Sequence, residues 1–221
     1  MRLSSKKINT ILNQVPVDYY DQGIKNNPFQ KYWHSKKWRN LKKFLKGQSG
    51  KLLDIGCADG TTTYQIHKNF PSLKITGLDY YEKAVDFARK TKPSIKFIVG
   101  DAHKLPFKNK CFDTVTVIET LEHLENPKQA LCEIYRVLKP KGCLILIQDT
   151  DSLLFRLVWW LWTKWKGSVW NHSHINCAQP GELFKILKSQ GFKIRRFEYS
   201  NLRMEIFVKA YKSFKSSLDK R

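Results

Sequence analysis

Lys51-Leu52-Leu53-Asp54-Ile55-Gly56-Cys57-Ala58-Asp59-Gly60 is the stretch that decides the fold. Its apolar residues predict a buried strand, and Gly56 to Gly60 predict a tight turn with little side-chain bulk. Because glycine carries no Cβ, such a turn lets the backbone approach a ligand closely. A second apolar run, 73–78, ends in Asp79, nineteen residues after Gly60. A glycine-rich turn followed by an acidic residue at the end of the next strand is typical of nucleotide-binding folds.

The spacing of the glycines argues against a dinucleotide as the ligand. A dinucleotide-binding fingerprint has the pattern G-x-G-x-x-G, whereas Gly56 and Gly60 lie four residues apart with Ala58 between them. Asp54 would also place a negative charge beside the ligand. That charge repels a pyrophosphate but attracts a ligand that carries an ammonium and a sulfonium group.

The pattern D-x-G-x-A-x-G resembles motif I of the class I S-adenosylmethionine (SAM)-dependent methyltransferases, with Ala58 where many members have glycine. Three later segments, 97–102, 112–127 and 136–147, resemble the same family in order and in spacing. Together they cover roughly residues 50 to 150. They resemble the small-molecule branch, methyltransferase type 11, which includes the ubiquinone and menaquinone biosynthesis methyltransferases. The resemblance implies a SAM-dependent enzyme that transfers a methyl group by in-line displacement.

This resemblance implies a Rossmann-like α/β fold. Its sheet would have seven strands, mostly parallel, with helices on both faces and an antiparallel last strand. The chain itself alternates strand-like and helix-like patterns at 51–56, 61–69, 73–79, 81–91, 95–99, 112–118, 127–138 and 142–148. Such alternation predicts a parallel sheet with right-handed crossovers. A helix over 180–190 and two strands, 192–199 and 202–211, are expected to follow.

The resemblance also implies the residues that hold the cofactor, SAM. The methionine moiety would lie against Asp54 and the turn that follows it, the ribose against Asp79, and the adenine against Tyr80 and the segment at Asp101. Residues 18–21 resemble a lid over the cofactor. The full predicted set is Asp54, Gly56, Cys57, Ala58, Gly60, Asp79, Tyr80, Asp101, Ala102 and Glu119.

A tryptophan-rich segment follows the fifth predicted strand. We predict a helical cap over 1–47 and a SAM-binding core over 48–221, with 151–178 as an insertion in that core. Five of the seven tryptophans lie between 159 and 170. The apolar run is too short to cross a bilayer, which takes ~20 residues, and Arg156 interrupts it. Two interpretations stay open: a lid that walls the acceptor site, or an interfacial helix over 153–166 on an anionic membrane.

Three histidines are candidate catalytic bases. His172 and His174 lie where this family borders the methyl-acceptor site, and His123 follows the fourth strand. A base is needed only if the acceptor is protonated at neutral pH, as an alcohol is. A structural role for these histidines is an equal alternative. We predict no metal site, because no third ligand accompanies the pair at 172 and 174.

Composition leaves the partner open. The 221 residues include 40 Lys and Arg against 19 Asp and Glu, a formal net charge of +21. This charge indicates either an anionic partner or a general lysine bias. We favour a small hydrophobic or lipid-linked acceptor, with an RNA methyltransferase or a non-catalytic protein of this fold as alternatives. Nucleic acid is disfavoured as a substrate for two reasons. Acidic residues follow the fourth predicted strand, and the Asn/Asp-Pro-Pro-Tyr/Phe motif that base-amino methyltransferases carry there is absent from the sequence.

Cysteine usage predicts the compartment. The five cysteines are scattered, mostly within apolar runs, and form no C-x-x-C pair. Reduced thiols of this kind are typical of a cytoplasmic protein. We therefore expect a cytoplasmic protein, with peripheral membrane contact if the interfacial interpretation of the insertion holds.

Overall fold

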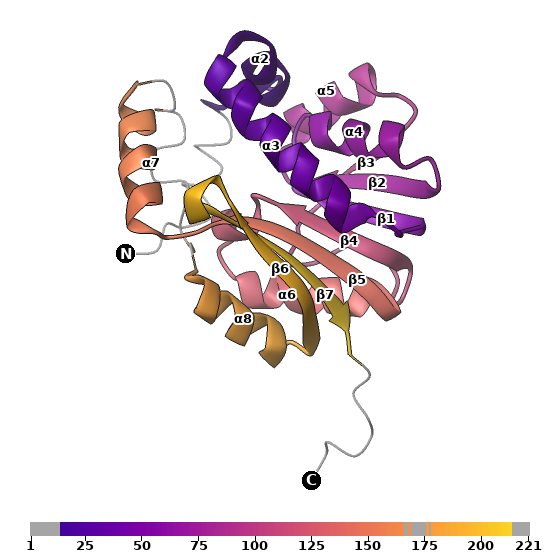
Figure 1. The fold of residues 1–221 in the computed structure, drawn as a ribbon. Helices are drawn as coiled ribbons and strands as arrows, with labels where there is room; N and C mark the ends of the chain where they lie inside the picture. The colour runs from indigo at the N-terminus through magenta and orange to yellow at the C-terminus, as the bar shows by residue number, and fades with distance from the viewer. Residues whose placement is uncertain (1–13, 166–167, 169–175, 177, 214–221) are drawn as a thin grey trace.

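A computed structural model of the chain describes residues 14–165, 168, 176 and 178–213. Its centre is one seven-stranded sheet with the order β3-β2-β1-β4-β5-β7-β6 (Figure 1). The strands are β1 (Gly50–Ile55), β2 (Leu73–Asp79), β3 (Lys96–Val99), β4 (Phe112–Ile118), β5 (Leu138–Asp149), β6 (Phe192–Ser200) and β7 (Glu205–Lys212). The helices are α2 (Tyr19–Asn26), α3 (Pro28–Leu45), α4 (Thr61–Asn69), α5 (Glu82–Thr91), α6 (Pro127–Val137), α7 (Leu153–Trp165) and α8 (Pro180–Ser189), with short 3₁₀ turns η1 (Leu121–His123) and η3 (Asn201–Arg203).

The pairing of the strands confirms the predicted fold class. Strands β3, β2, β1, β4 and β5 pair in parallel. Strand β7 is antiparallel to both of its neighbours, β5 and β6. The order of the strands reverses between β1 and β4, and ligands of open α/β sheets bind in the crevice that such a reversal leaves at the carboxyl ends.

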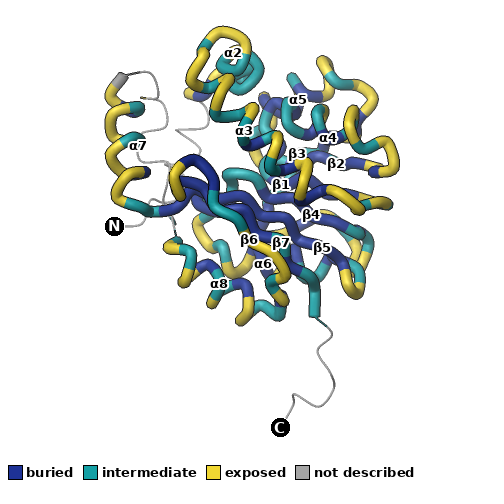
Figure 2. Tube along the Cα trace, viewed as in Figure 1, coloured by how far each residue is buried: buried dark blue, intermediate teal, exposed yellow. Residues whose placement is uncertain are grey.

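Alternating side chains of the strands pack against helices on the two faces of the sheet. On one face, Leu53 and Leu144 belong to a core that also contains apolar residues of α6 and α8. On the other, Leu52 and Ile145 pack with apolar residues of α3, α4 and α5. Figure 2 shows the buried strands enclosed between these helical layers. The period of two that places neighbours on opposite faces follows from the pleat of a strand.

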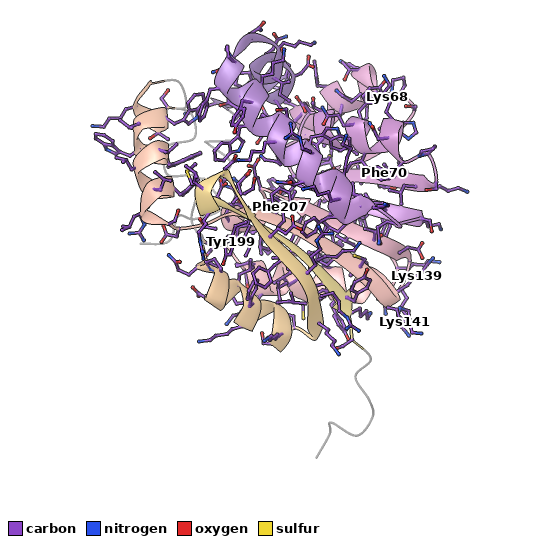
Figure 3. The ribbon with its side chains drawn as sticks, viewed as in Figure 1. Lys68, Phe70, Lys139, Lys141, Tyr199 and Phe207 are labelled. Carbon is purple, nitrogen blue, oxygen red and sulfur yellow. The ribbon has the colours of Figure 1, made fainter. Side chains whose placement is uncertain are left out.

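The N-terminal helices pack over one face of the sheet. Helix α3 begins at Pro28, where the Asn27 side chain accepts hydrogen bonds from the backbone N–H groups of Phe29 and Gln30 at 3.0 and 3.3 Å. An Asn cap with proline in the first turn is a sequence signal for a helix start. The far end of α3 is anchored where the rings of Phe44 and Phe207 lie 5.6 Å apart. Figure 3 labels Phe207, which belongs to β7.

Helix α7 stands beside the sheet rather than over it, at the left in Figure 1. It follows β5 directly and lies within the predicted insertion 151–178. Within the described part of the chain, no helix has the length and apolar character needed to cross a membrane.

Candidate active site

The turn after β1 is shaped by backbone conformations that favour glycine. Gly56 has φ +75°, and a Cβ built there would lie 2.0 Å from Thr120 Oγ1. Ala58 also lies in the left-handed region, at φ +46°, although a Cβ makes that region costly. The backbone N–H of Ala58 donates to Asp79 Oδ2 at 2.8 Å. The carboxylate at the end of β2 thus holds the turn at the position where many family members have glycine.

Asp79 joins the first two strand ends. Its second oxygen, Oδ1, accepts from the backbone N–H of Tyr81 at 2.8 Å. Burial raises the pKa of Asp79, while the backbone donors act in the opposite direction. Charge-assisted bonds of this kind are stronger than neutral ones. Asp79 is therefore a fixed acceptor at the carboxyl edge of the sheet.

A cavity of about 480 Å³ opens at this edge. Eight of the residues predicted from the sequence line it: Gly56, Ala58, Asp79, Tyr80, Asp101, Ala102, Glu119 and His123. Its wall combines a turn without side-chain bulk and several carboxylates, which suits a ligand that is positively charged and closely approached by backbone. The residues present therefore fit the predicted cofactor.

Three predicted residues do not line this cavity. Cys57 and Asp54 line a smaller adjoining cavity of about 50 Å³, and Gly60, at φ +74°, is the N-cap that precedes α4. Asp54 accepts hydrogen bonds from Thr63 Oγ1 at 2.6 Å and from Thr116 Oγ1 at 2.7 Å. Burial raises the pKa of Asp54 to about 6, against the effect of these hydroxyls. Both oxygens of Asp54 thus tie β1 to its neighbours, and direct contact with the methionine moiety stays a prediction.

Asp101 is oriented by the residues that follow it. Its Oδ1 accepts from the backbone N–H of His103 at 2.8 Å and lies 2.7 Å from His103 Nδ1. The His103 Nε2 atom accepts from the backbone N–H of Asn126 at 3.2 Å. This chain of contacts fixes the direction of the carboxylate that is predicted to bind the adenine.

A second cavity, of about 120 Å³, adjoins the first. Half of its lining residues are Tyr, Phe or Trp of α2, α3 and α7: Tyr19, Tyr20, Phe29, Trp33, Phe155, Trp159 and Trp162. Four residues line both cavities, namely Tyr19, Tyr20, Glu119 and His123. We call this second cavity the aromatic pocket. A ligand in it would lie directly beside a ligand in the larger cavity.

The polar side of the aromatic pocket is a buried charge cluster around Lys37. This lysine, 4% exposed, forms an ion pair with Glu119 and lies 3.6 Å from Glu205 Oε1. Burial disfavours the charge of Lys37, but Glu119 and Glu205 raise its pKa above the ordinary value. The Lys37 ammonium in turn lowers the pKa of Glu119, against the effect of burial. The pair therefore stays ionised.

The other carboxyl groups of the cluster hold protons more readily. Burial raises the pKa of Glu122 to about 8 and that of Glu205 to about 7, and burial also raises the pKa of Asp149. Within the described residues, Glu119, Asp149 and Glu205 form one group whose carboxylate oxygens lie within 4.8 Å of one another, as metal ligands do. The Lys37 ammonium already lies against two of these three side chains.

Of the three predicted bases, His123 belongs to the described part of the chain. His123 ends η1 and lines both cavities. His172 and His174 lie outside the described residues. His34 was not predicted from the sequence, yet it lines the aromatic pocket, and burial lowers its pKa to about 4. A neutral imidazole at physiological pH is thus part of this wall.

Sequence reasoning missed Lys37, Asp149 and Glu205 because their spacing carries no motif. The first lies on a helix rich in lysine, and the other two stand at the end of β5 and the start of β7. Asp149 did carry one signal, since it ends a buried strand as Asp79 does. Asp59 was also missed; its Oδ2 accepts from the Asp21 backbone N–H at 3.1 Å and ties α2 to the turn.

Comparison with known proteins supports the expected family. Residues 53–146 match the model of the family described as a methyltransferase domain. A demethylmenaquinone methyltransferase of Thermotoga maritima is 28% identical over 72% of this chain and 77% of its own length. The Lactococcus lactis protein of the same name is 30% identical over 69% of this chain. That alignment spans 62% of the Lactococcus protein, under two thirds of its length.

Solved structures share the architecture. The PH0226 protein of Pyrococcus horikoshii superposes with a TM-score of 0.70 and 24% identity, over 85% of this chain and 93% of its own. An identity at that level concerns the fold alone. The assignment to the methyltransferases rests instead on the matched domain and on the cavity at the carboxyl edge of the sheet.

Proposed function

The chain is a class I SAM-dependent methyltransferase, and from this premise we propose that it methylates a small, hydrophobic or lipid-linked acceptor bound in the aromatic pocket. The observation that carries the proposal is the junction of the two cavities at Tyr19, Tyr20, Glu119 and His123. Methyl transfer from a sulfonium needs the acceptor atom in line with the methyl carbon and the sulfur. Two adjoining cavities with a common wall suit that requirement.

The residues assigned to the cofactor follow from the wall of the larger cavity. The backbone at Gly56 and Ala58, the carboxylate of Asp79, and Asp101 would hold SAM, which supplies an electrophilic methyl group when bound. The chain then has to orient the acceptor and exclude water. Positioning alone can contribute about 7–11 kcal/mol to such a reaction. The aromatic rings from α2, α3 and α7 are suited to both tasks.

The acceptor must lose a proton if its nucleophilic atom carries one. Glu119 and His123 line both cavities, so either can reach a group that lies at the junction. We propose that one of these two residues accepts the proton of the acceptor, and that Lys37 keeps Glu119 ionised. His172 and His174 remain predicted alternatives. The quinone-related names of the relatives agree with a hydrophobic acceptor, and we adopt that class for this chain.

The test is to trace the methyl group. Purified protein is incubated with methyl-labelled SAM and an extract of the source cells, and label is measured in the organic, aqueous and RNA fractions. We expect label in the organic fraction. Trp159→Ala should lower that label about tenfold or more while the Kd for SAM stays within about twofold, because Trp159 lines only the aromatic pocket.

A matched control is Trp38→Ala, since Trp38 packs against the core under α3 and lines neither cavity. It should leave the distribution of label unchanged. Label in RNA would contradict the proposed acceptor class and give the net charge of +21 a direct role. Label in the aqueous fraction would also contradict it and indicate a soluble metabolite.

A further inference from the structure

Helix α7 carries large apolar side chains on two opposite faces. Its inner face lines the aromatic pocket with Phe155, Val158, Trp159 and Trp162. On its outer face, the exposed fractions of Leu153, Leu157, Trp160 and Leu161 are 83%, 54%, 51% and 54%. A surface helix of a globular protein normally pairs an apolar stripe with a charged one. Exposed leucines and a tryptophan in one row are instead the mark of an interaction site.

The charges that accompany the outer face are basic. Arg156 and Lys164 are the charged residues of α7, and the Lys164 ammonium lies 4.4 Å from the centroid of the Trp160 ring. Arg156 pairs with Asp151, and its side chain remains 61% exposed. A face of leucine and tryptophan that is bordered by cations is therefore complementary to an apolar layer with anionic groups at its edge.

The neighbouring helix extends this basic character. Helices α3 and α7 meet where the rings of Phe29 and Trp162 lie 6.0 Å apart. Helix α3 contains no acidic residue, and its basic residues are Lys31, Lys36, Lys37, Arg39, Lys42 and Lys43. Of these, Lys37 is buried and the rest are exposed or half-buried. Helices α3 and α7, two of the three that wall the aromatic pocket, thus present cations and apolar side chains to the outside.

We propose that the outer face of α7 docks on the surface of an anionic lipid bilayer. Trp160 would lie at headgroup level, with Leu153, Leu157 and Leu161 toward the acyl chains and Lys164 against lipid phosphate. A second copy of the chain is a poorer occupant, since each copy carries a formal charge of +21. Helix α7 has 13 residues, fewer than a membrane span requires, so it lies in the interface.

Docking in this orientation has a consequence for the acceptor. The face of α7 opposite to the bilayer forms a wall of the aromatic pocket, so the pocket comes to lie one helix diameter, ~10 Å, from the acyl chains. A lipid-linked acceptor then moves from the bilayer to the pocket without crossing bulk water. This consequence rests on the proposed function, whereas the docking itself does not depend on which molecule is methylated.

Flotation with lipid vesicles tests the docking. Purified protein is mixed with vesicles of phosphatidylcholine alone or with about 30 mol% phosphatidylglycerol, and the floated fraction is measured. We expect binding to the anionic vesicles that weakens with added salt. The double variant Leu157→Gln/Leu161→Gln should lower the partition coefficient about tenfold or more, because both side chains leave water on docking.

The matched control is Tyr64→Gln, a substitution of a 37% exposed aromatic residue on α4, across the molecule from α7 (Figure 1). It should bind vesicles as the original chain does. Binding of S-adenosylhomocysteine by all variants verifies that they are folded, since none of these residues lines the described cavities. If methyl tracing fails while flotation succeeds, the proposed function falls and the docking stands.

Two results would overturn the docking proposal. One is an original chain that stays in the soluble fraction with both kinds of vesicle. The other is a double variant that floats as well as the control. Size-exclusion chromatography then interprets the first result: if the original chain elutes as a dimer and the double variant as a monomer, the outer face of α7 is a contact between copies.

Discussion

The cofactor side and the acceptor side of this site stabilise their buried carboxylates in different ways. On the cofactor side, Asp54 accepts from threonine hydroxyls of α4 and β4, and Asp79 accepts from two backbone N–H groups. On the acceptor side, Glu119 and Glu205 gather around the single ammonium of Lys37, which comes from a helix far away in the sequence. Each cofactor-side carboxylate thus has two hydrogen-bond donors, whereas Glu119 and Glu205 share one ammonium, with Asn201 Nδ2 as a further donor to Glu205 at 2.5 Å.

This difference indicates which side is more sensitive to a single substitution. Removal of one donor from a carboxylate with several donors leaves the others in place. Removal of the Lys37 ammonium leaves the buried Glu119 carboxylate without its ion-pair partner, which is costly in a medium of low dielectric constant. The acceptor side should therefore respond more strongly to a single substitution and to pH.

The largest effect is expected from Lys37→Met. This substitution keeps most of the side-chain volume but removes the charge between Glu119 and Glu205. We expect the free energy of unfolding to fall by about 3–5 kcal/mol, as it does when one partner of a buried ion pair is removed. Urea denaturation at neutral pH measures it. Lys43→Met, on the exposed side of the same helix, should change stability by less than about 0.5 kcal/mol. Equal stability of the two variants would refute the proposed dependence on one cation.

Next in size is the effect of Asp79→Ala on the cofactor side. The variant loses the acceptor for the backbone N–H groups of Ala58 and Tyr81 and the predicted partner of the ribose. We expect the Kd for SAM to rise about a hundredfold or more, or ~2.7 kcal/mol, in isothermal titration calorimetry. The fold should persist by circular dichroism, because the core clusters are untouched. Asp86→Ala, on the exposed face of α5, is the control, and micromolar binding retained in Asp79→Ala would contradict the assignment.

A smaller effect is expected from pH. The pKa of Glu122 is raised from 4.5 to about 8 and that of Glu205 to about 7, so the folded protein holds protons that the unfolded chain releases. Their contribution to stability is complete below pH 4.5 and is lost as the pH rises to about 8. His34 opposes this trend only below pH 6.5, since its pKa falls to about 4 on folding.

Between pH 6.5 and 8 the free energy of unfolding should therefore decrease, by about 1–2 kcal/mol, in urea titrations at several pH values. Glu122→Gln should flatten the slope, because an amide does not titrate. Glu82→Gln, an exposed substitution on α5, should leave the slope as it is. A stability that increases over this interval would show that the cluster is ionised in the folded protein and that the contrast between the two sides is wrong.

The cofactor side was largely predictable from the sequence. Gly56, Asp79 and Asp101 all stand at the carboxyl ends of predicted strands, and parallel strands bring such ends to one edge of a sheet. Asp54 shows the limit of that reasoning. Its position beside the turn was expected, but its two threonine partners come from α4 and β4, and sequence spacing alone does not reveal them.

The sequence by itself determined the alternation of strands and helices, the glycine turn, and the acidic residues at the strand ends. These features depend on local periodicity and on backbone conformations that few residues tolerate. Only the tertiary structure decided that Lys37, Glu119, Asp149 and Glu205 meet, and that one face of α7 walls the aromatic pocket while the other is exposed. Periodicity shows that a helix has apolar faces, but which neighbour each face meets depends on how distant elements pack.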